Sequence, residues 1–202
     1  GGMENGVVNL LNRLPPERYR HAIVSLTDAS EFRRRLKRLD EIEFVELRQP
    51  KGNDFGTHRR LYRELRRLRP AILHTRNLAA QEGQIGGFLA RTPVRIHGEH
   101  GRDMYDLHGK AWKYNLLRKA LRPIIHRYVA VSRDLADWLV DTVGVPKTRV
   151  RQIYNGVDDA KFAPREGTRP PILPEGFAPP GAVVFGTVGR MAEVKDQTNL
   201  AR

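Results

Sequence analysis

Apolar positions in residues 1–160 follow two alternating patterns. Short apolar runs rich in β-branched residues predict strands. Between them, longer segments carry an apolar residue at every third or fourth position, as a helix does when one of its faces is buried. The predicted strands are 22–26, 44–47, 72–74, 94–96, 128–131 and 150–153. The predicted helices are 7–14, 30–39 (with Ser30 as its N-cap), 57–68, 78–90, 110–126 (with a break near Pro123) and 133–143.

Strands and helices alternate throughout this region, and no hairpin turn joins two successive strands. This order is typical of a parallel sheet with helices on both faces, because parallel neighbours need a crossover connection. We therefore predict an α/β fold with a Rossmann-like parallel sheet. Three glycines in the helix predicted at 78–90 allow it to pack closely against its neighbours.

The pattern changes after residue 154. Residues 163–181 contain six of the thirteen prolines and show no periodicity, which indicates a linker. An apolar run at 183–188 then predicts a buried strand, and a helix begins at Asp196. We predict a Rossmann-like domain over 1–160, a Pro-rich linker over 161–181 and the start of a second domain over 182–202.

Composition narrows the function classes. The sequence has no cysteine, which excludes disulfides, cysteine-ligated zinc and thiol nucleophiles. Lysine and arginine total 36 against 23 aspartate and glutamate residues, a net charge of +13. The charge is spread evenly, with 19 basic residues in 1–100 and 17 in 101–202. Because no aromatic-basic recognition motif accompanies it, we expect no nucleic-acid partner.

In an open parallel sheet, ligands bind at the carboxyl ends of the strands. Gly1 and Gly2 precede the first helix, where bare backbone N–H groups can approach an anion; a simple tight turn is the alternative. Residues 97–103 follow the fourth predicted strand and combine two histidines with carboxylates. They suit polar substrate binding through a neutral imidazole, and a solvated loop is the plain alternative. A metal site is disfavoured, because the spacing of His97 and His100 is not that of a helical zinc motif.

Two groups of basic residues are further candidates. Arg190 and Lys195 stand beside the helix that begins at Asp196 and can clamp a diphosphate, although exposed surface cations fit the sequence equally well. Residues 110–128 combine basic side chains with an apolar stripe that includes Trp112. Such a helix can lie on an anionic membrane surface, or it can cover the sheet and expose a solvated basic face.

Four motifs resemble the family-four GT-B glycosyltransferases, the retaining group 1 enzymes. They are Gly1-Gly2-Met3-Glu4, Glu99-His100-Gly101, Tyr154-Asn-Gly-Val-Asp158, and Gly186-Thr-Val-Gly-Arg190 with Lys195-Asp196. The last two together are the more specific, and the resemblance covers nearly the whole chain. The subgroup that looks closest contains sugar transferases associated with exosortase (PEP-CTERM) exopolysaccharide loci.

The resemblance implies an activity and a location. It implies transfer of a sugar from a nucleotide-diphosphate sugar to a glycan or lipid-linked acceptor in surface polysaccharide synthesis. It also implies a cytoplasmic enzyme, and residues 110–128 are the candidate for contact with the inner face of the plasma membrane. Family members retain the anomeric configuration and need no bound metal, so neither a metal nor a cofactor is expected beside the nucleotide-sugar substrate.

The resemblance also assigns roles to particular residues. Arg190 and Lys195 would contact the donor diphosphate and stabilise the leaving nucleotide diphosphate, with Gly1 and Gly2 near the same phosphates. His100 would contact the transferred sugar, with His97 as its alternate. The expected acceptor-side residues are Arg76, Asn77, His97 and Arg102.

The family pattern is incomplete in this sequence. The strand that would precede Gly1 is absent, and the acidic motif that contacts the donor sugar would lie beyond Arg202. We therefore expect a longer chain, no transferase activity from the 202 residues alone, and poor solubility from exposed strand edges. A nucleotide-sugar epimerase of the same architecture is the nearest enzyme alternative, although Arg190 and Lys195 favour the transferase. A basic nucleic-acid or membrane-surface module is the alternative from another class.

Overall fold

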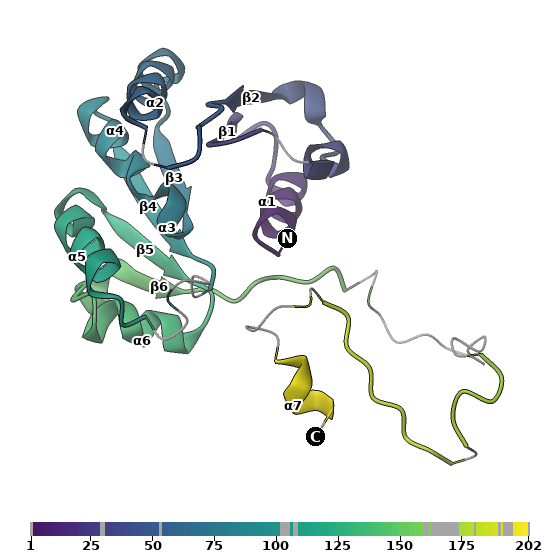
Figure 1. The fold of residues 1–202 in the computed structure, drawn as a ribbon. Coiled ribbons are helices and arrows are strands. Elements are labelled where there is room, and N and C mark those ends of the chain that lie inside the picture. Colours follow the sequence, from purple (N-terminus) through teal and green to yellow (C-terminus); the bar gives the residue numbers. More distant parts are fainter. Residues whose placement is uncertain are drawn as a thin grey trace. The chain divides into compact units, whose positions relative to one another are not determined.

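A computed structural model describes residues 2–28, 31–52, 54–101, 106, 109–159, 162, 174–179, 181–189, 191 and 196–201. The chain divides into two compact units, residues 1–156 and 157–202. The first unit is α/β, with parallel strands flanked by helices (Figure 1). This confirms the fold class that the alternating pattern predicts.

Two parallel sheets form the core layer of the first unit. The first pairs β1 (His21–Ser25) with β2 (Ile42–Glu46). The second contains, in spatial order, β3 (Ile72–Arg76), β4 (Val94–Glu99), β5 (Arg127–Ala130) and β6 (Val150–Gln152). The single predicted sheet is thus two separate sheets, since no strand among the described residues pairs with both β1 and β3.

Helices cover both faces of the smaller sheet. The buried residues of α1 (Gly2–Arg13) pack with Ile23, whereas Leu61 of α2 (Phe55–Leu68) packs in a cluster with Val24. Successive strand residues point to opposite faces, so Ile23 and Val24 place α1 and α2 on opposite sides.

The start of α2 is fixed by a side-chain cap. The carboxylate of Asp54 accepts hydrogen bonds from the backbone N–H groups of Gly56 and Thr57, at 3.0 and 2.8 Å. These two donors have no partner within the helix, so the cap stabilises its first turn. The helix therefore begins two residues before its predicted start at Thr57.

The helix predicted at 78–90 is two helices, α3 (Asn77–Gln81) and α4 (Gly83–Leu89). α4 and α2 lie side by side (Figure 1). Gly87 is buried in α4, and a Cβ at this position would collide with the side chain of Leu73 in β3. The expected close packing of this glycine-rich helix is confirmed.

The largest hydrophobic cluster lies where α5 (Trp112–Leu121) and α6 (Arg133–Asp141) pack near β5 and β6. The helix predicted at 110–126 ends at Leu121 and continues as one 3-10 turn, η3 (Arg122–Ile124). Another such turn, η4 (Lys147–Arg149), precedes β6. The buried members of the cluster are Leu121, Ile125, Tyr128, Ala130, Leu135, Trp138, Leu139, Val143, Val145 and Val150.

The prediction of a helix over residues 30–39 is wrong. The segment instead forms two 3-10 turns, η1 (Glu31–Arg35) and η2 (Leu39–Glu41). The side chain of Asn12 in α1 donates to the carbonyl of Arg35 at 3.0 Å and accepts from the backbone N–H of Lys37 at 2.8 Å. An α-helix would need these backbone groups for its own hydrogen bonds, so the contact with α1 favours the shorter turns.

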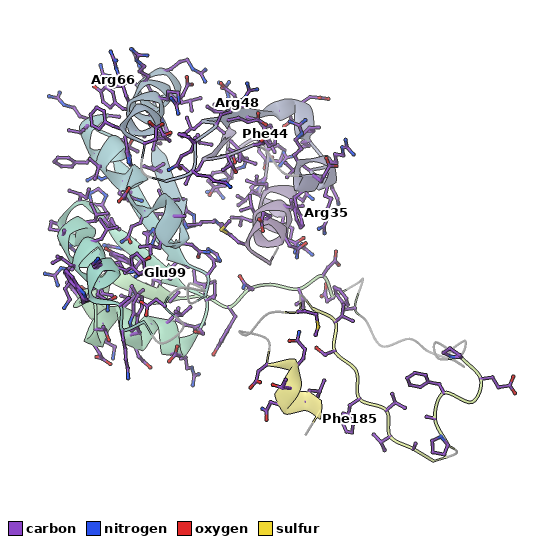
Figure 2. The ribbon with its side chains drawn as sticks, in the orientation of Figure 1. Arg35, Phe44, Arg48, Arg66, Glu99 and Phe185 are labelled. Carbon is purple, nitrogen blue, oxygen red and sulfur yellow. The ribbon has the colours of Figure 1, made fainter. Side chains whose placement is uncertain are left out.

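The second unit carries one confirmed and one wrong prediction. Its helix α7 (Gln197–Ala201) begins directly after Asp196, as predicted. Residues 183–188 are not a strand, and Phe185, which is 80% exposed, projects from an extended segment (Figure 2). A strand needs a neighbour for its backbone hydrogen bonds, and no described residue of this unit provides one.

Candidate active site at the carboxyl edge of the sheet

The ends of β3 and β4 bring two polar residues together. The strands are parallel and in register from Ile72 with Val94 onward, so Asn77 and His100 follow them at the same edge. The backbone N–H of His100 donates to Oδ1 of Asn77 at 2.9 Å. Asn77 has a φ of 58°, in the left-handed region that asparagine tolerates better than most residues. The turns after the two strands are therefore tied to one another.

Gly98 provides the space for two imidazole rings. A Cβ at this position would lie 2.9 Å from Nε2 of His100 and 3.0 Å from Nε2 of His74. Among the described residues, none forms a hydrogen bond with Nε2 of His100, although this atom is shielded from solvent. An imidazole nitrogen at the ligand-binding edge of a sheet is suited to a hydroxyl of a bound molecule.

The electrostatic environment keeps His100 neutral. Burial, together with the positive charge of Arg76, lowers the pKa of His100 to about 4, against the opposing effect of Glu99. Burial also lowers the pKa of Arg76, but an arginine remains charged at pH 7. A neutral imidazole can donate a hydrogen bond from one ring nitrogen and accept one at the other.

Helix α1 approaches the same edge. A Cβ at Gly6 would lie 3.9 Å from Nη1 of Arg76, so the guanidinium lies beside the first half of this helix. The expected candidates Arg76, Asn77 and His100 therefore lie together. Gly2, the first described residue of α1, is exposed, with open space around its Cα.

A buried hydrogen-bonded network lies on the face of β3 and β4 opposite to His74 and His100. Oγ1 of Thr75 and Nδ1 of His97 are 2.8 Å apart, and Nε2 of His97 is 3.4 Å from Oε1 of Glu99. Nε of Arg118, from α5, donates to the same carboxylate oxygen at 3.1 Å. Burial alone raises the pKa of Glu99, but the hydrogen bond to His97 and the charge of Arg118 outweigh it and hold that pKa below its ordinary value.

His97 lies within β4 and not in the loop predicted to follow it. β4 continues to Glu99, three residues past its predicted end, and His97 is 0% exposed inside the sheet. Both of its ring nitrogens face protein partners. The imidazole therefore belongs to the buried network, and its expected contact with an acceptor stays a prediction.

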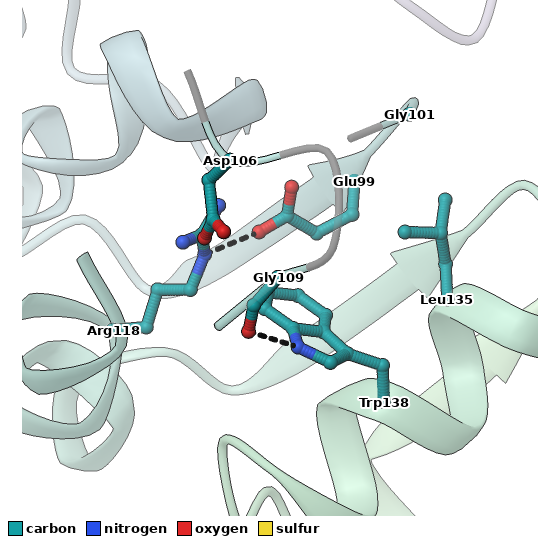
Figure 3. Close-up of a pocket in the computed structure, with 7 residues that line it drawn as sticks. All are labelled: Glu99, Gly101, Asp106, Gly109, Arg118, Leu135 and Trp138. Atoms are coloured by element: carbon teal, nitrogen blue, oxygen red, sulfur yellow. Dashed lines mark hydrogen bonds and ion pairs between the residues drawn. The ribbon is translucent and has the colours of Figure 1, made fainter. Parts of the chain in front are cut away.

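A small pocket adjoins this network (Figure 3). Figure 3 shows Arg118 reaching Glu99 on one side and the indole of Trp138 donating to the carbonyl of Gly109 on the other, at 3.0 Å. Asp106 accepts from the backbone N–H groups of Lys110 and Ala111, which directly precede α5, at 2.8 and 3.0 Å. The lining residues are Glu99, Gly101, Asp106, Gly109, Arg118, Leu135 and Trp138.

Sequence reasoning missed the role of Arg118. A solvated basic face is one of the alternatives predicted for residues 110–128, but Arg118 is 3% exposed and lies over the ring of Trp138 at 4.8 Å. The helical spacing does indicate that Arg118 is buried, since it lies three residues from both Asn115 and Leu121, which are buried. The expected site residues Gly1, Arg102, Arg190 and Lys195, and the expected cap Ser30, lie outside the described residues.

In the part of the chain that the structure describes, no group of three or more His, Cys, Asp or Glu side chains is arranged to hold a metal ion. No described helix has the length and apolar character needed to cross a membrane.

The fold and the polar edge define the class of protein. Parallel strands with flanking helices are the features of a Rossmann-like domain, and such domains bind ligands at the carboxyl ends of their strands. The family model "Glycosyltransferase Family 4" matches residues 1–161, and the chain belongs to this family of GT-B glycosyltransferases. No curated protein matches the chain. Membership in the family makes sugar donors and acceptors the substrates to consider.

Proposed function

We propose that this protein is a retaining glycosyltransferase. It transfers a sugar from a nucleotide-diphosphate sugar to a glycan or lipid-linked acceptor in surface polysaccharide synthesis. The observation that carries the proposal is the cluster of Arg76, Asn77 and His100 at the carboxyl edge of a domain that belongs to Glycosyltransferase Family 4. From the motif pattern, we also propose that the enzyme belongs to the exosortase-associated subgroup of sugar transferases.

In this proposal, His100 contacts the transferred sugar. Its neutral imidazole suits a hydrogen bond with a sugar hydroxyl, and its Nε2 has no partner among the described residues. Arg76 and Asn77 lie next to it and contribute to the acceptor side. Arg102 completes that side by its position in the sequence, three residues after the end of β4.

The donor side rests on the motif resemblance. By that resemblance, Arg190 and Lys195 are the proposed ligands of the diphosphate, and Gly1 and Gly2 are assigned to the same phosphates. Two cations at the diphosphate stabilise the negative charge that develops on the leaving nucleotide, which is the role a metal ion has in other transferases. We therefore propose that the reaction needs neither a metal nor a cofactor.

The outer face of α5 supports a second part of the proposal, contact with an anionic membrane. Trp112 and Leu116 are 68% and 59% exposed, one helical turn apart. Lys113 and Lys119 are exposed on the same helix, and residues 110–128 contain no aspartate or glutamate. An aromatic and aliphatic pair surrounded by lysines suits the headgroup region of an anionic bilayer. We propose that this contact holds the enzyme at the inner face of the plasma membrane, next to a lipid-linked acceptor.

The family match favours a transferase over an epimerase of similar architecture. A screen of nucleotide-diphosphate sugars on the full-length enzyme tests the proposal, with release of nucleoside diphosphate as the readout. Arg190→Ala and Lys195→Ala should each lower the rate by at least tenfold, whereas Arg63→Ala, a change of an exposed arginine in α2, should not. If no sugar nucleotide is consumed, or both variants turn over at the wild-type rate, the proposed function is wrong.

A further inference from the structure

The last residues of β4 point alternately to the two faces of the sheet. Glu99 shares one face with His97, and His100 shares the other with Gly98, whose missing side chain makes room for the His100 imidazole. The direction in which His100 points is therefore linked to the direction in which Glu99 is held.

The carboxylate of Glu99 is held firmly. Its side chain is 1% exposed, and one of its oxygens accepts from Nε of Arg118 at 3.1 Å. Within a water-excluded interior, a charge-assisted hydrogen bond is stronger than at the surface, and its loss leaves an uncompensated charge. Glu99 thus has a strong energetic reason to keep this orientation.

Arg118 is held as firmly as its partner. Its guanidinium lies over the ring of Trp138 at 4.8 Å, and its side chain is almost fully buried. The indole of Trp138 in turn donates to the carbonyl of Gly109, which also accepts from the side chain of Asn115 at 2.9 Å. These contacts tie α5, α6 and the segment before α5 to the end of β4.

We propose that Arg118 is a positioning residue for His100. Through Glu99, it holds the end of β4 so that the backbone N–H of His100 reaches Asn77 and the imidazole stays over Gly98. Its relevance to catalysis rests on the proposed function, in which His100 contacts the transferred sugar. The positioning itself is a property of the protein without substrate.

A purely structural role for the Glu99–Arg118 pair would produce a different result from positioning. If the pair only stabilised the fold, its loss would raise hydrogen exchange throughout the first unit. If Arg118 positions His100, its loss releases the His100 amide while amides in the main core keep their protection. Leu139, which is 0% exposed in α6, is the reference for that core.

Amide hydrogen exchange followed by NMR on the full chain tests the proposal. In Arg118→Met, we expect protection of the His100 amide to fall by at least tenfold while that of Leu139 stays unchanged. Arg118→Lys, which retains the charge, should restore part of the protection, and Lys119→Met, a change on the outer face of the same helix, should have no effect. Unchanged protection of His100 in a folded Arg118→Met protein would overturn the proposal.

A second variant covers the case in which Arg118→Met does not fold. Glu99→Gln keeps the side-chain volume but removes the charge that Arg118 holds, and the same selective loss at His100 is expected; equal protection there would overturn the proposal. The proposed function is tested separately. It fails if His100→Ala leaves sugar transfer unchanged, whatever the exchange experiment shows.

Discussion

The proposed membrane contact of α5 is open to a quantitative test by replacing Trp112 and Leu116 with serine. An aromatic side chain buries roughly 150–250 Å² when it leaves water. Trp112 is 68% exposed, so about two-thirds of that area is available, worth about 3 kcal/mol at roughly 25 cal/mol per Å². Leu116, at 59% exposed, adds about 1–2 kcal/mol.

Full insertion of both side chains would thus contribute about 4–5 kcal/mol to the free energy of membrane binding. A helix that lies in the headgroup region buries only part of its outer face, so we take half of this value, about 2–2.5 kcal/mol. The double variant should then partition onto vesicles with 20% anionic lipid roughly 30- to 70-fold more weakly than the wild type. Lys113 and Lys119 are retained, so the residual binding should weaken further as the salt concentration rises.

The assay is co-sedimentation of the full-length enzyme with such vesicles. Phe55→Ser is the matched control, because Phe55 is 84% exposed at the start of α2, on a different helix. It should bind as the wild type does. If the Trp112→Ser, Leu116→Ser protein partitions at the wild-type level, the exposed face of α5 is a solvated surface and does not contact the membrane.

Three further predictions concern stability. Gly86→Ala should stabilise the chain by about 0.5–1 kcal/mol, because the new Cβ would have ordinary contacts, the nearest at 3.5 Å. Gly87→Ala should destabilise the chain by about 1 kcal/mol or more, because its Cβ would collide with Leu73. Equal urea midpoints for the two variants would contradict this. Leu139→Ala should cost about 2–5 kcal/mol in urea unfolding, since the side chain is 0% exposed in the main core, and a loss below 1 kcal/mol would count against that core. The folded pKa of His100, about 4, lies below its unfolded value of about 6.5, so its contribution to stability is present above pH 6.5 and is lost as pH falls from 6.5 towards 4. His100→Asn should make the unfolding free energy less pH-dependent in that window, and an unchanged slope would contradict the environment described for His100.

Much of the fold could be predicted because the pattern of apolar positions responds to burial. The strands and most helices of the first unit follow from it, and Ser132 caps α6 where the sequence places its start, accepting from Leu135 N–H at 3.2 Å. The pattern failed where a distant residue decided the outcome. The side chain of Asn12 takes backbone groups that a helix over 30–39 would need, and no local signal predicts that contact.

The site was predictable in part for a related reason. The segment 97–103, which contains His100, could be identified because it follows a strand of a parallel sheet, whereas the role of Asn77 came from the family resemblance. The supporting layer was not identified, because buried polar residues on a strand look like a solvated face in the sequence. Arg95, His97 and Glu99 alternate along β4 as exposed residues would, yet all three are buried and hydrogen-bonded. Their partners come from elements that the sequence does not place opposite them.

The most direct test of the proposed active site is sugar transfer by His100→Ala in the full-length enzyme. The readout is transfer of a radiolabelled sugar from the donor that the screen identifies to a lipid extract that contains acceptor. His58→Ala is the control, since His58 is part of the partly exposed surface of α2. We predict a loss of at least 100-fold for His100→Ala and a wild-type rate for His58→Ala. Wild-type transfer by a folded His100→Ala enzyme would contradict the claim that this edge of the sheet is the active site.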